Sequence, residues 1–305
     1  MAGTTTPRPA WQPRSTDYLA AALPAVPGLA RLPGLRRAGD QLPSTVEQVP
    51  DVHVDREHLA RYTRLCGFDL SDHLPATYPH VLGFGAQLRL VTSRSFPFPA
   101  VGLVHIANSI AVHRPLFASV PLSLTVQARD LRPHPRGRQL SLVTTGTVDG
   151  EPVWEETSTY LRRGPGADPD ARRPGPEPSD LTTGTVTWRL PADLGRRYAE
   201  VSGDLNPIHL NPLFARAFGF PRAIAHGMWT AARALAAVQH RLPDTYRYDV
   251  AFAAPILLPS TVTLAVRAGD APGHADLAVI GSKGRHHLTG VLEELQEPAH
   301  AALVR

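Results

Sequence analysis

The chain has 305 residues, which corresponds to about two domains, and a chain of this length can bury a full core without disulfides or metal ions as staples. Hydrophobic residues make up 43% and charged residues 19% of the sequence, so the composition excludes an intrinsically disordered protein. The net charge is +4, but the arginines are scattered along the chain with acidic residues between them, which disfavours a nucleic-acid-binding protein.

The cysteine content and the N-terminal segment indicate a cellular compartment. Cys66 is the only cysteine, which excludes an intramolecular disulfide and a thiolate zinc cluster, and which fits a reducing compartment. Residues 1–14 contain no apolar signal-peptide core, and Pro24 and Pro27 interrupt the apolar run 19–30. We therefore expect a cytoplasmic protein with no membrane insertion.

The first half of the chain is predicted to form one strand, one helix, one long apolar helix and four further strands. Residues 1–43 are expected to be an N-terminal extension, partly disordered, with at most a short helix at 17–26. The elements of the following domain, 44–163, are predicted at 46–54, 56–67, 79–93, 102–113, 122–131, 139–148 and 153–162.

A linker and a second unit with the same order of elements follow. Residues 164–180 contain five prolines and three glycines without apolar periodicity, as expected of a flexible linker. In the domain 181–305 we predict a strand, a helix, a polar–apolar insert, a long helix and four strands, at 183–190, 192–201, 203–221, 226–242, 246–256, 261–268, 274–281 and 285–295. Hairpin-length connections cannot form parallel crossovers, so both sheets should be antiparallel, which predicts a duplicated α+β fold.

The duplication also shows in the sequence itself. The stretch 62–68 aligns with 198–204, and His80 then corresponds to His226 at the start of the second long helix. The first interval, from Gly67 to His80, is 13 residues, and the second, from Gly203 to His226, is 23, so the second copy carries ten additional residues.

The insert opens with a group of residues suited to proton transfer. Asn206 is a good N-cap and Pro207 a good first helical residue, so a short helix should carry His209 in its first turn, close to Asp204 in the preceding loop. An acid and an imidazole held on one turn form a plausible proton-transfer pair. The alternative is a capped helix start with a surface aspartate and a structural histidine.

The start of the second long helix offers a backbone donor. The first N–H groups of a helix have no intrahelical partner, so the N–H of Gly227 could hold an oxyanion or the carbonyl oxygen of a thioester. The alternative is that Gly227 only permits close packing of the helix on the sheet.

These residues carry a family resemblance. The string YAEVSGDLNPIH at 198–209, followed by IAHGM at 224–228, resembles the MaoC-like, R-specific enoyl-CoA hydratase (hydratase 2) family. The first half, with TYPHVLGFGAQL at 77–88 and FPFPAVGLVHI at 96–106, resembles the double-hotdog actinobacterial 3-hydroxyacyl-thioester dehydratases. One departure is Asn211, where many relatives carry aspartate, and we expect it to affect the start of a helix rather than the activity.

The resemblance implies an α+β double hotdog, in which two curled antiparallel sheets each wrap around a long central helix. It also implies a hydro-lyase of fatty acid metabolism that reversibly hydrates trans-2-enoyl thioesters to (R)-3-hydroxyacyl thioesters on CoA or acyl carrier protein, with no cofactor or metal. By position, Asp204 and His209 would be the catalytic pair, while Asn206 and Gly227 would be substrate-binding. Such a chain needs no partner copy to complete its site but is compatible with a homodimer.

Two other functions stay open on the sequence. A hotdog fold could bind acyl thioesters without turnover, although the four motif residues are intact. It could also be a thioesterase, which usually needs a carboxylate on or near the central helix, and 226–242 contains none.

The first half is expected to lack catalysis, because Phe68 occupies the position of Asp204 and the insert is missing. We expect its long helix, 79–93, to line a groove for the acyl chain. The alternative is that Gly83 and Gly85 only allow close packing on the sheet.

Overall fold

The computed structural model describes residues 12–22, 40–271 and 273–295. Of the expected extension 1–43, the described residues are 12–22, which include helix α1 (Ser15–Ala22), and 40–43. In the first half, the elements are β1 (Val46–Val52), α2 (Arg56–Cys66), α3 (Tyr78–Thr92), β2 (Leu103–Val112), β3 (Leu122–His134), β4 (Gly137–Val148) and β5 (Glu151–Arg163).

The second half repeats this order around the insert. Its elements are β6 (Val186–Leu190), α4 (Leu194–Ser202), α5 (Pro207–Leu210), α6 (Pro212–Ala217), α7 (Gly227–Ala236), β7 (Tyr246–Phe252), β8 (Ser260–Ala268), β9 (Ala275–Ile280) and β10 (His286–Glu294). Two 3₁₀ turns lie at Gln239–Arg241 and Ser282–Gly284.

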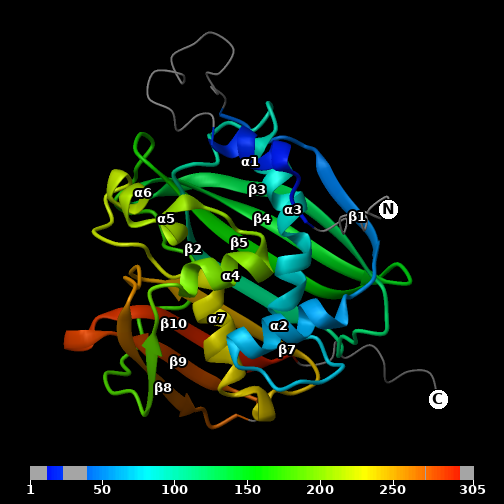
Figure 1. The fold of residues 1–305 in the computed structure, drawn as a ribbon, viewed down its shortest axis with the longest axis vertical. Helices are drawn as coiled ribbons and strands as arrows, with labels where there is room; N and C mark the ends of the chain where they lie inside the picture. Colours follow the sequence, from blue (N-terminus) through cyan, green and yellow to red (C-terminus); the bar gives the residue numbers. More distant parts are fainter. Residues whose placement is uncertain (1–11, 23–39, 272, 296–305) are drawn as a thin grey trace, which may run out of the picture.

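The strands form one antiparallel sheet of ten strands in the order β1-β3-β4-β5-β2-β7-β10-β9-β8-β6. Each half supplies five neighbouring strands, and the halves join edge to edge where Ala107–Val112 of β2 pairs with Tyr246–Ala251 of β7. Figure 1 shows α2, α3, α4 and α7 gathered on one face of this curved sheet. The α+β double hotdog is confirmed, with the two expected sheets continuous across the β2–β7 pair.

The central helix of the second half is shorter than predicted. We expected it to span 226–242, but α7 ends at Ala236 and the chain continues into the 3₁₀ turn. Pro243 follows this turn, and the residue before a proline is sterically driven out of helical conformation. Leu242 is accordingly extended, with ψ of 127°.

The helices of the two halves share one core. The Tyr62 ring contacts Tyr78 of its own half at 5.2 Å and Tyr198 of the other half at 6.4 Å between ring centroids. The indole N–H of Trp229 in α7 donates to the carbonyl of Leu65 in α2 at 3.2 Å. One hydrophobic cluster of buried residues therefore extends through both halves, which fixes the halves relative to each other.

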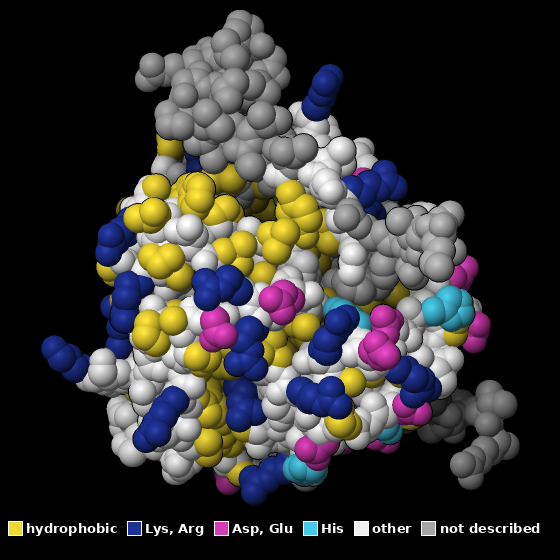
Figure 2. All heavy atoms as spheres, in the orientation of Figure 1, with side chains coloured by type: hydrophobic (Ala, Val, Ile, Leu, Met, Phe, Trp, Pro, Cys, Tyr) yellow, Lys and Arg dark blue, Asp and Glu magenta, His cyan; other side chains and the backbone are white. Residues whose placement is uncertain are grey.

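On the face drawn in Figure 2, Lys and Arg side chains lie dispersed among Asp and Glu rather than in one basic patch. Across the described segments, every helix is too short or too polar to cross a lipid bilayer.

Candidate active site

The loop after α4 holds Asp204 in a defined position. Gly203 closes α4 with a φ of 74°, a left-handed conformation that glycine adopts without strain, and so turns the chain away from the helix. The N–H of Asp204 donates to Ser202 Oγ at 3.1 Å, and the N–H of Asn206 donates to Asp204 Oδ1 at 3.1 Å. These two bonds fix both the backbone and the carboxylate of Asp204.

Asn206 and Pro207 start the short helix as predicted. The Asn206 side chain accepts a hydrogen bond from the Ile208 N–H at 3.4 Å, and helix α5 then carries the buried His209. His209 Nδ1 lies 2.8 Å from the carbonyl oxygen of Ile224. A carbonyl only accepts, so Nδ1 carries the proton and the lone pair of the neutral ring is on Nε2.

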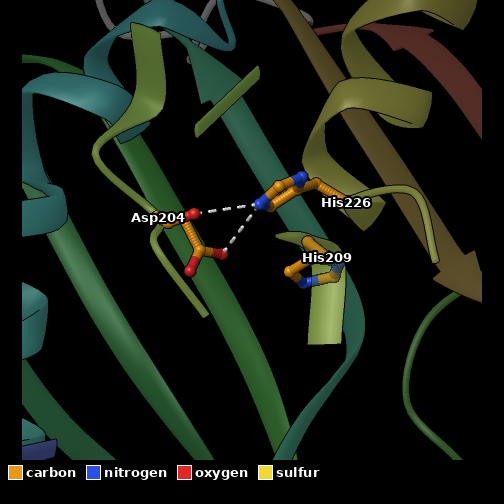
Figure 3. Close-up of side chains that lie close together, drawn as sticks. All are labelled: Asp204, His209 and His226. Atoms are coloured by element: carbon orange, nitrogen blue, oxygen red, sulfur yellow. Dashed lines mark hydrogen bonds and ion pairs between the residues drawn. The ribbon is translucent and has the colours of Figure 1, made fainter. Parts of the chain in front are cut away.

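A second histidine joins the predicted pair. His226, the residue before α7, stacks on His209 with 3.7 Å between ring centroids and 25° between planes. Its Nε2 lies 3.1 Å from the backbone carbonyl of Asp204 and 3.7 Å from Asp204 Oδ2, as Figure 3 shows. The sequence placed His226 at the helix start but gave it no role in the site. The HG dipeptide of the family motif was the signal that could have assigned one.

The electrostatics of this cluster favour an ionised acid and neutral rings. Burial opposes ionisation of Asp204, but His226, His209 and the Asn206 N–H together hold the pKa of its carboxyl below the usual value. Burial lowers the pKa of His209, against the opposing effects of Asp204 and the Ile224 carbonyl. Burial also lowers the pKa of His226 to about 3. These directions favour a carboxylate at Asp204 and unprotonated rings at His209 and His226 near neutral pH.

The same three residues could offer ligands to a metal ion. One ligand atom from each of Asp204, His209 and His226 lies within 4.8 Å of the others. Two ring nitrogens of this group are already occupied by the carbonyls of Ile224 and Asp204. The hydrogen bonds therefore fit two histidines held in fixed tautomers for acid–base chemistry.

One cavity of about 720 Å³ contains all four predicted site residues. Asp204, Asn206, His209 and Gly227 line it together with His226. The structure thus brings together the residues that the sequence selected, although the part of each in catalysis or binding stays a prediction.

Gly227 presents both of its expected features. Among the described residues its N–H has no hydrogen-bond partner, and it opens α7 at the cavity wall. A Cβ at this position would lie 3.1 Å from the ring of Phe252, so close packing also favours glycine here.

The cavity borders the end of the β2–β7 pairing. This pairing stops at Ala107 and Ala251, and the cavity is lined by residues 103–106, which follow β5 without reaching β7, together with 252–256. The segment 172–178, which the sequence assigned to a flexible linker, also lines the cavity. Gly175 packs so tightly there that a Cβ would lie 3.0 Å from Ala251 Cβ.

The groove expected along the first central helix is mostly filled. Of α3, only His80 and Phe84 line the cavity. A Cβ on Gly83 would lie 3.3 Å from Thr144 Cγ2, and α1 contacts α3, so close packing explains this helix better than an open acyl groove. Asn211 caps α6 by accepting from the Leu213 N–H at 2.8 Å, in line with its expected role at a helix start.

Comparison with known proteins places this site in a family. Residues 171–282 match the model of the MaoC like domain. The chain is 39% identical over 279 residues to 3-hydroxyacyl-thioester dehydratase X of Mycobacterium tuberculosis, covering 90% of this chain and 95% of that protein. It is 26% identical over 199 residues to the peroxisomal enoyl-CoA hydratase 2 of Arabidopsis thaliana, covering 61% of this chain and 64% of the relative.

A solved structure agrees with these relatives. A crystal structure of HtdX of M. tuberculosis superposes with a TM-score of 0.73 at 37% identity, covering 82% of this chain and 100% of that chain. The fold and the cavity define a double-hotdog protein whose second half brings an acid and two imidazoles to one cavity. The chain belongs to the MaoC-like dehydratase family.

Proposed function

We propose that the chain reversibly hydrates trans-2-enoyl thioesters to (R)-3-hydroxyacyl thioesters. The observation that carries this proposal is the proximity of Asp204 to His209. A carboxylate oxygen of Asp204 lies within 4.8 Å of a ring nitrogen of His209, in a cavity that Gly227 also lines. Family membership supports the same reaction, since relatives are named as a 3-hydroxyacyl-thioester dehydratase and an enoyl-CoA hydratase.

The geometry suggests a division of labour in the hydration direction. Asp204 and the free Nε2 of His209 hold a water molecule against C3 of the substrate. One proton passes from the water to the pair as the C3–O bond forms, and one proton returns from the pair to C2, so the pair ends in its starting state. Negative charge develops on the thioester oxygen, where the N–H of Gly227 would stabilise it.

Asn206 serves this arrangement mainly by positioning. Its side-chain oxygen caps the helix that carries His209, and its backbone N–H orients the carboxylate of Asp204. Because Asn206 also lines the cavity, its side-chain amide nitrogen is available to a substrate oxygen.

The cavity rim fits a carrier that bears phosphate. Four exposed arginines line it, and within the described part of the chain none of them forms an ion pair with an acid: Arg136, Arg163, Arg172 and Arg173. Acyl-CoA and acyl carrier protein both present an anionic phosphopantetheine arm, which unpaired arginines attract. Arg222, in the loop before α7, is not part of this rim and donates to the Pro259 carbonyl at 3.0 Å.

Crotonyl-CoA tests the reaction class. A hydratase removes the enone absorbance without releasing free thiol, a thioesterase releases free thiol, and a non-catalytic binding protein does neither. His209→Ala should lower turnover about 10²–10⁴-fold, the range for loss of one acid–base group. The control is His240→Ala in the same half, because the His240 side chain is 79% exposed and lies outside the cavity lining.

A further inference from the structure

A buried ion pair in the first half borders the proposed active site. His80 Nδ1 lies 2.7 Å from Glu156 Oε1 and 3.0 Å from Oε2, and the Glu156 side chain is 0% exposed. Asn108 Nδ2 donates to Oε1 at 2.7 Å, and Gln87 Nε2 donates to Oε2 at 3.2 Å. Three donors from α3 and β2 therefore surround one buried carboxylate.

This environment favours the protonated form of His80. Burial opposes ionisation of Glu156, yet His80 and Asn108 hold the pKa of its carboxyl below the usual value. Burial likewise opposes protonation of His80, but the adjacent Glu156 raises the pKa of its imidazole above 6.5. The other titratable groups near the pair are His105, Tyr160 and Asp204.

The second nitrogen of His80 remains available to a ligand. His80 lines the same cavity as Asp204 and His209, and its Nε2 has no hydrogen-bond partner among the residues that the structure describes. Beside it, His105 stacks at 6.3 Å between ring centroids, and its buried Nε2 also lacks a partner in the described chain. His80 thus has one nitrogen bound to Glu156 and one without a protein partner at the cavity wall.

Stability alone does not account for such a pair. A buried ion pair is often no more stabilising than apolar residues of similar volume, because both charges must be desolvated. An imidazolium whose free N–H points at a cavity can instead donate a charge-assisted hydrogen bond to a ligand oxygen.

We propose that His80, oriented by Glu156, is a substrate-positioning residue that donates a hydrogen bond from Nε2 to an oxygen of the bound acyl thioester. The inference rests on the proposed function, and it gives the first hotdog a direct part in substrate recognition although it lacks the Asp–His pair. His80 corresponds to His226 in the internal repeat, so the two central helices would each present one histidine to one shared cavity.

Glu156→Gln tests this without changing the cavity wall. A neutral amide no longer supports the imidazolium, so Nε2 of His80 becomes an acceptor when Nδ1 keeps its proton. KM for crotonyl-CoA should rise about tenfold, the effect of losing about 1.4 kcal/mol of binding, while kcat changes little. The fall of kcat/KM on the alkaline side, where wild-type His80 loses its proton above pH 6.5, should move to lower pH.

The matched control is His58→Gln. His58 is also a buried histidine of the first half, but it bridges Tyr78 and the Val201 carbonyl and does not line the cavity. This variant should lose stability and keep the wild-type KM and alkaline limb. If Glu156→Gln and His80→Gln both behave as His58→Gln does, His80 is structural and the inference is wrong.

An NMR measurement on the wild-type chain tests the inference without requiring that any variant folds. Butyryl-CoA, a saturated analogue of the substrate, should shift the ring NMR resonances of His80 and leave those of His58 unchanged. An unshifted His80 ring in a chain that binds butyryl-CoA would overturn the inference. If the wild-type chain does not hydrate crotonyl-CoA at all, the proposed function fails first, so the two failures are distinguishable.

Discussion

The two halves of the chain share the turn that ends their first helix, but they differ in the residue that follows it. Helices α2 and α4 both end at a left-handed glycine, Gly67 with φ of 80° and Gly203 with φ of 74°. The next residue in the first half is Phe68, which is 8% exposed and joins the hydrophobic core. The next residue in the second half is Asp204, which faces the cavity. One duplicated turn thus delivers a core residue in one copy and an acid in the other.

The two halves also differ in the segments that follow these turns. The second half has room for α5 and α6, and α5 carries His209 to the cavity, whereas the first half reaches its central helix ten residues sooner. The first half still supplies His80 and Phe84 to the same cavity. The comparison indicates that the two copies share one scaffold, that the second carries the proposed acid–base pair, and that the first contributes to the walls of the same cavity.

The largest expected effect on kcat comes from changing the acid after the second turn, and a matched change beside the first turn serves as its control. Asp204→Asn removes the carboxylate of the proposed pair and should lower kcat for crotonyl-CoA about 10²–10⁴-fold. Asp69→Asn is the matched change beside the first turn, where the Asp69 side chain is 67% exposed and outside the cavity lining, and it should leave kcat unchanged. Near-native kcat in folded Asp204→Asn would contradict the assignment of the acid.

The pH profile is expected to show the neutral state of His209. Burial lowers the pKa of His209, so its unprotonated form should persist below pH 6.5 and the acid limb of kcat/KM should lie below that value. Asp204 opposes this shift, so the residual activity of Asp204→Asn should have its acid limb at a still lower pH. A wild-type limb centred at or above pH 6.5 would show that another group controls the reaction.

Substitution of two arginines in the linker between the halves should have a smaller effect, which is on KM. Exposed ion pairs contribute about 0.2–1 kcal/mol each, so Arg172→Gln with Arg173→Gln should raise KM for crotonyl-CoA about two- to thirtyfold. The matched control is Arg196→Gln with Arg197→Gln, an exposed arginine pair on α4 outside the cavity lining.

Two further measurements isolate the phosphate contact. The rise in KM should shrink with added salt, because salt screens exposed charges. It should also vanish for the crotonyl thioester of N-acetylcysteamine, which carries no phosphate. An equal rise for that substrate would mean that the linker arginines shape the cavity rather than bind the carrier.

Local patterns were sufficient to predict much of this molecule. Apolar periodicity and turn residues gave the order of strands and helices in both halves, and the GDLNPIH string at 203–209 placed Asp204 and His209 on one turn. These features depend on neighbours in the chain, so a single sequence contains them.

Features that depend on distant neighbours were not predictable in this way. The stacking of His226 on His209 requires α7 to lie beside α5, and the His80–Glu156 pair joins residues 76 positions apart. The linker composition indicates flexibility, but the tight approach of Gly175 to Ala251 shows that it packs against the β2–β7 junction. In each case the partner is set by tertiary packing, which composition does not reveal.

The smallest expected effect concerns the residue before each glycine, which is Cys66 in the first half and Ser202 in the second. Ser202 Oγ accepts the N–H of Asp204, so Ser202→Ala should cost about 0.5–1.5 kcal/mol and lower kcat about two- to tenfold by loosening the acid. Cys66 is fully buried, and burial raises the pKa of its thiol, so it is an unreactive core residue. Cys66→Ala should therefore lower Tm and leave kcat unchanged.

Ser202→Cys places the residue of the first half in the second, and because sulfur is a weak acceptor it should lower kcat as Ser202→Ala does. Equal kcat values in Ser202→Ala and wild type would show that the Asn206 N–H alone suffices to hold the carboxylate of Asp204.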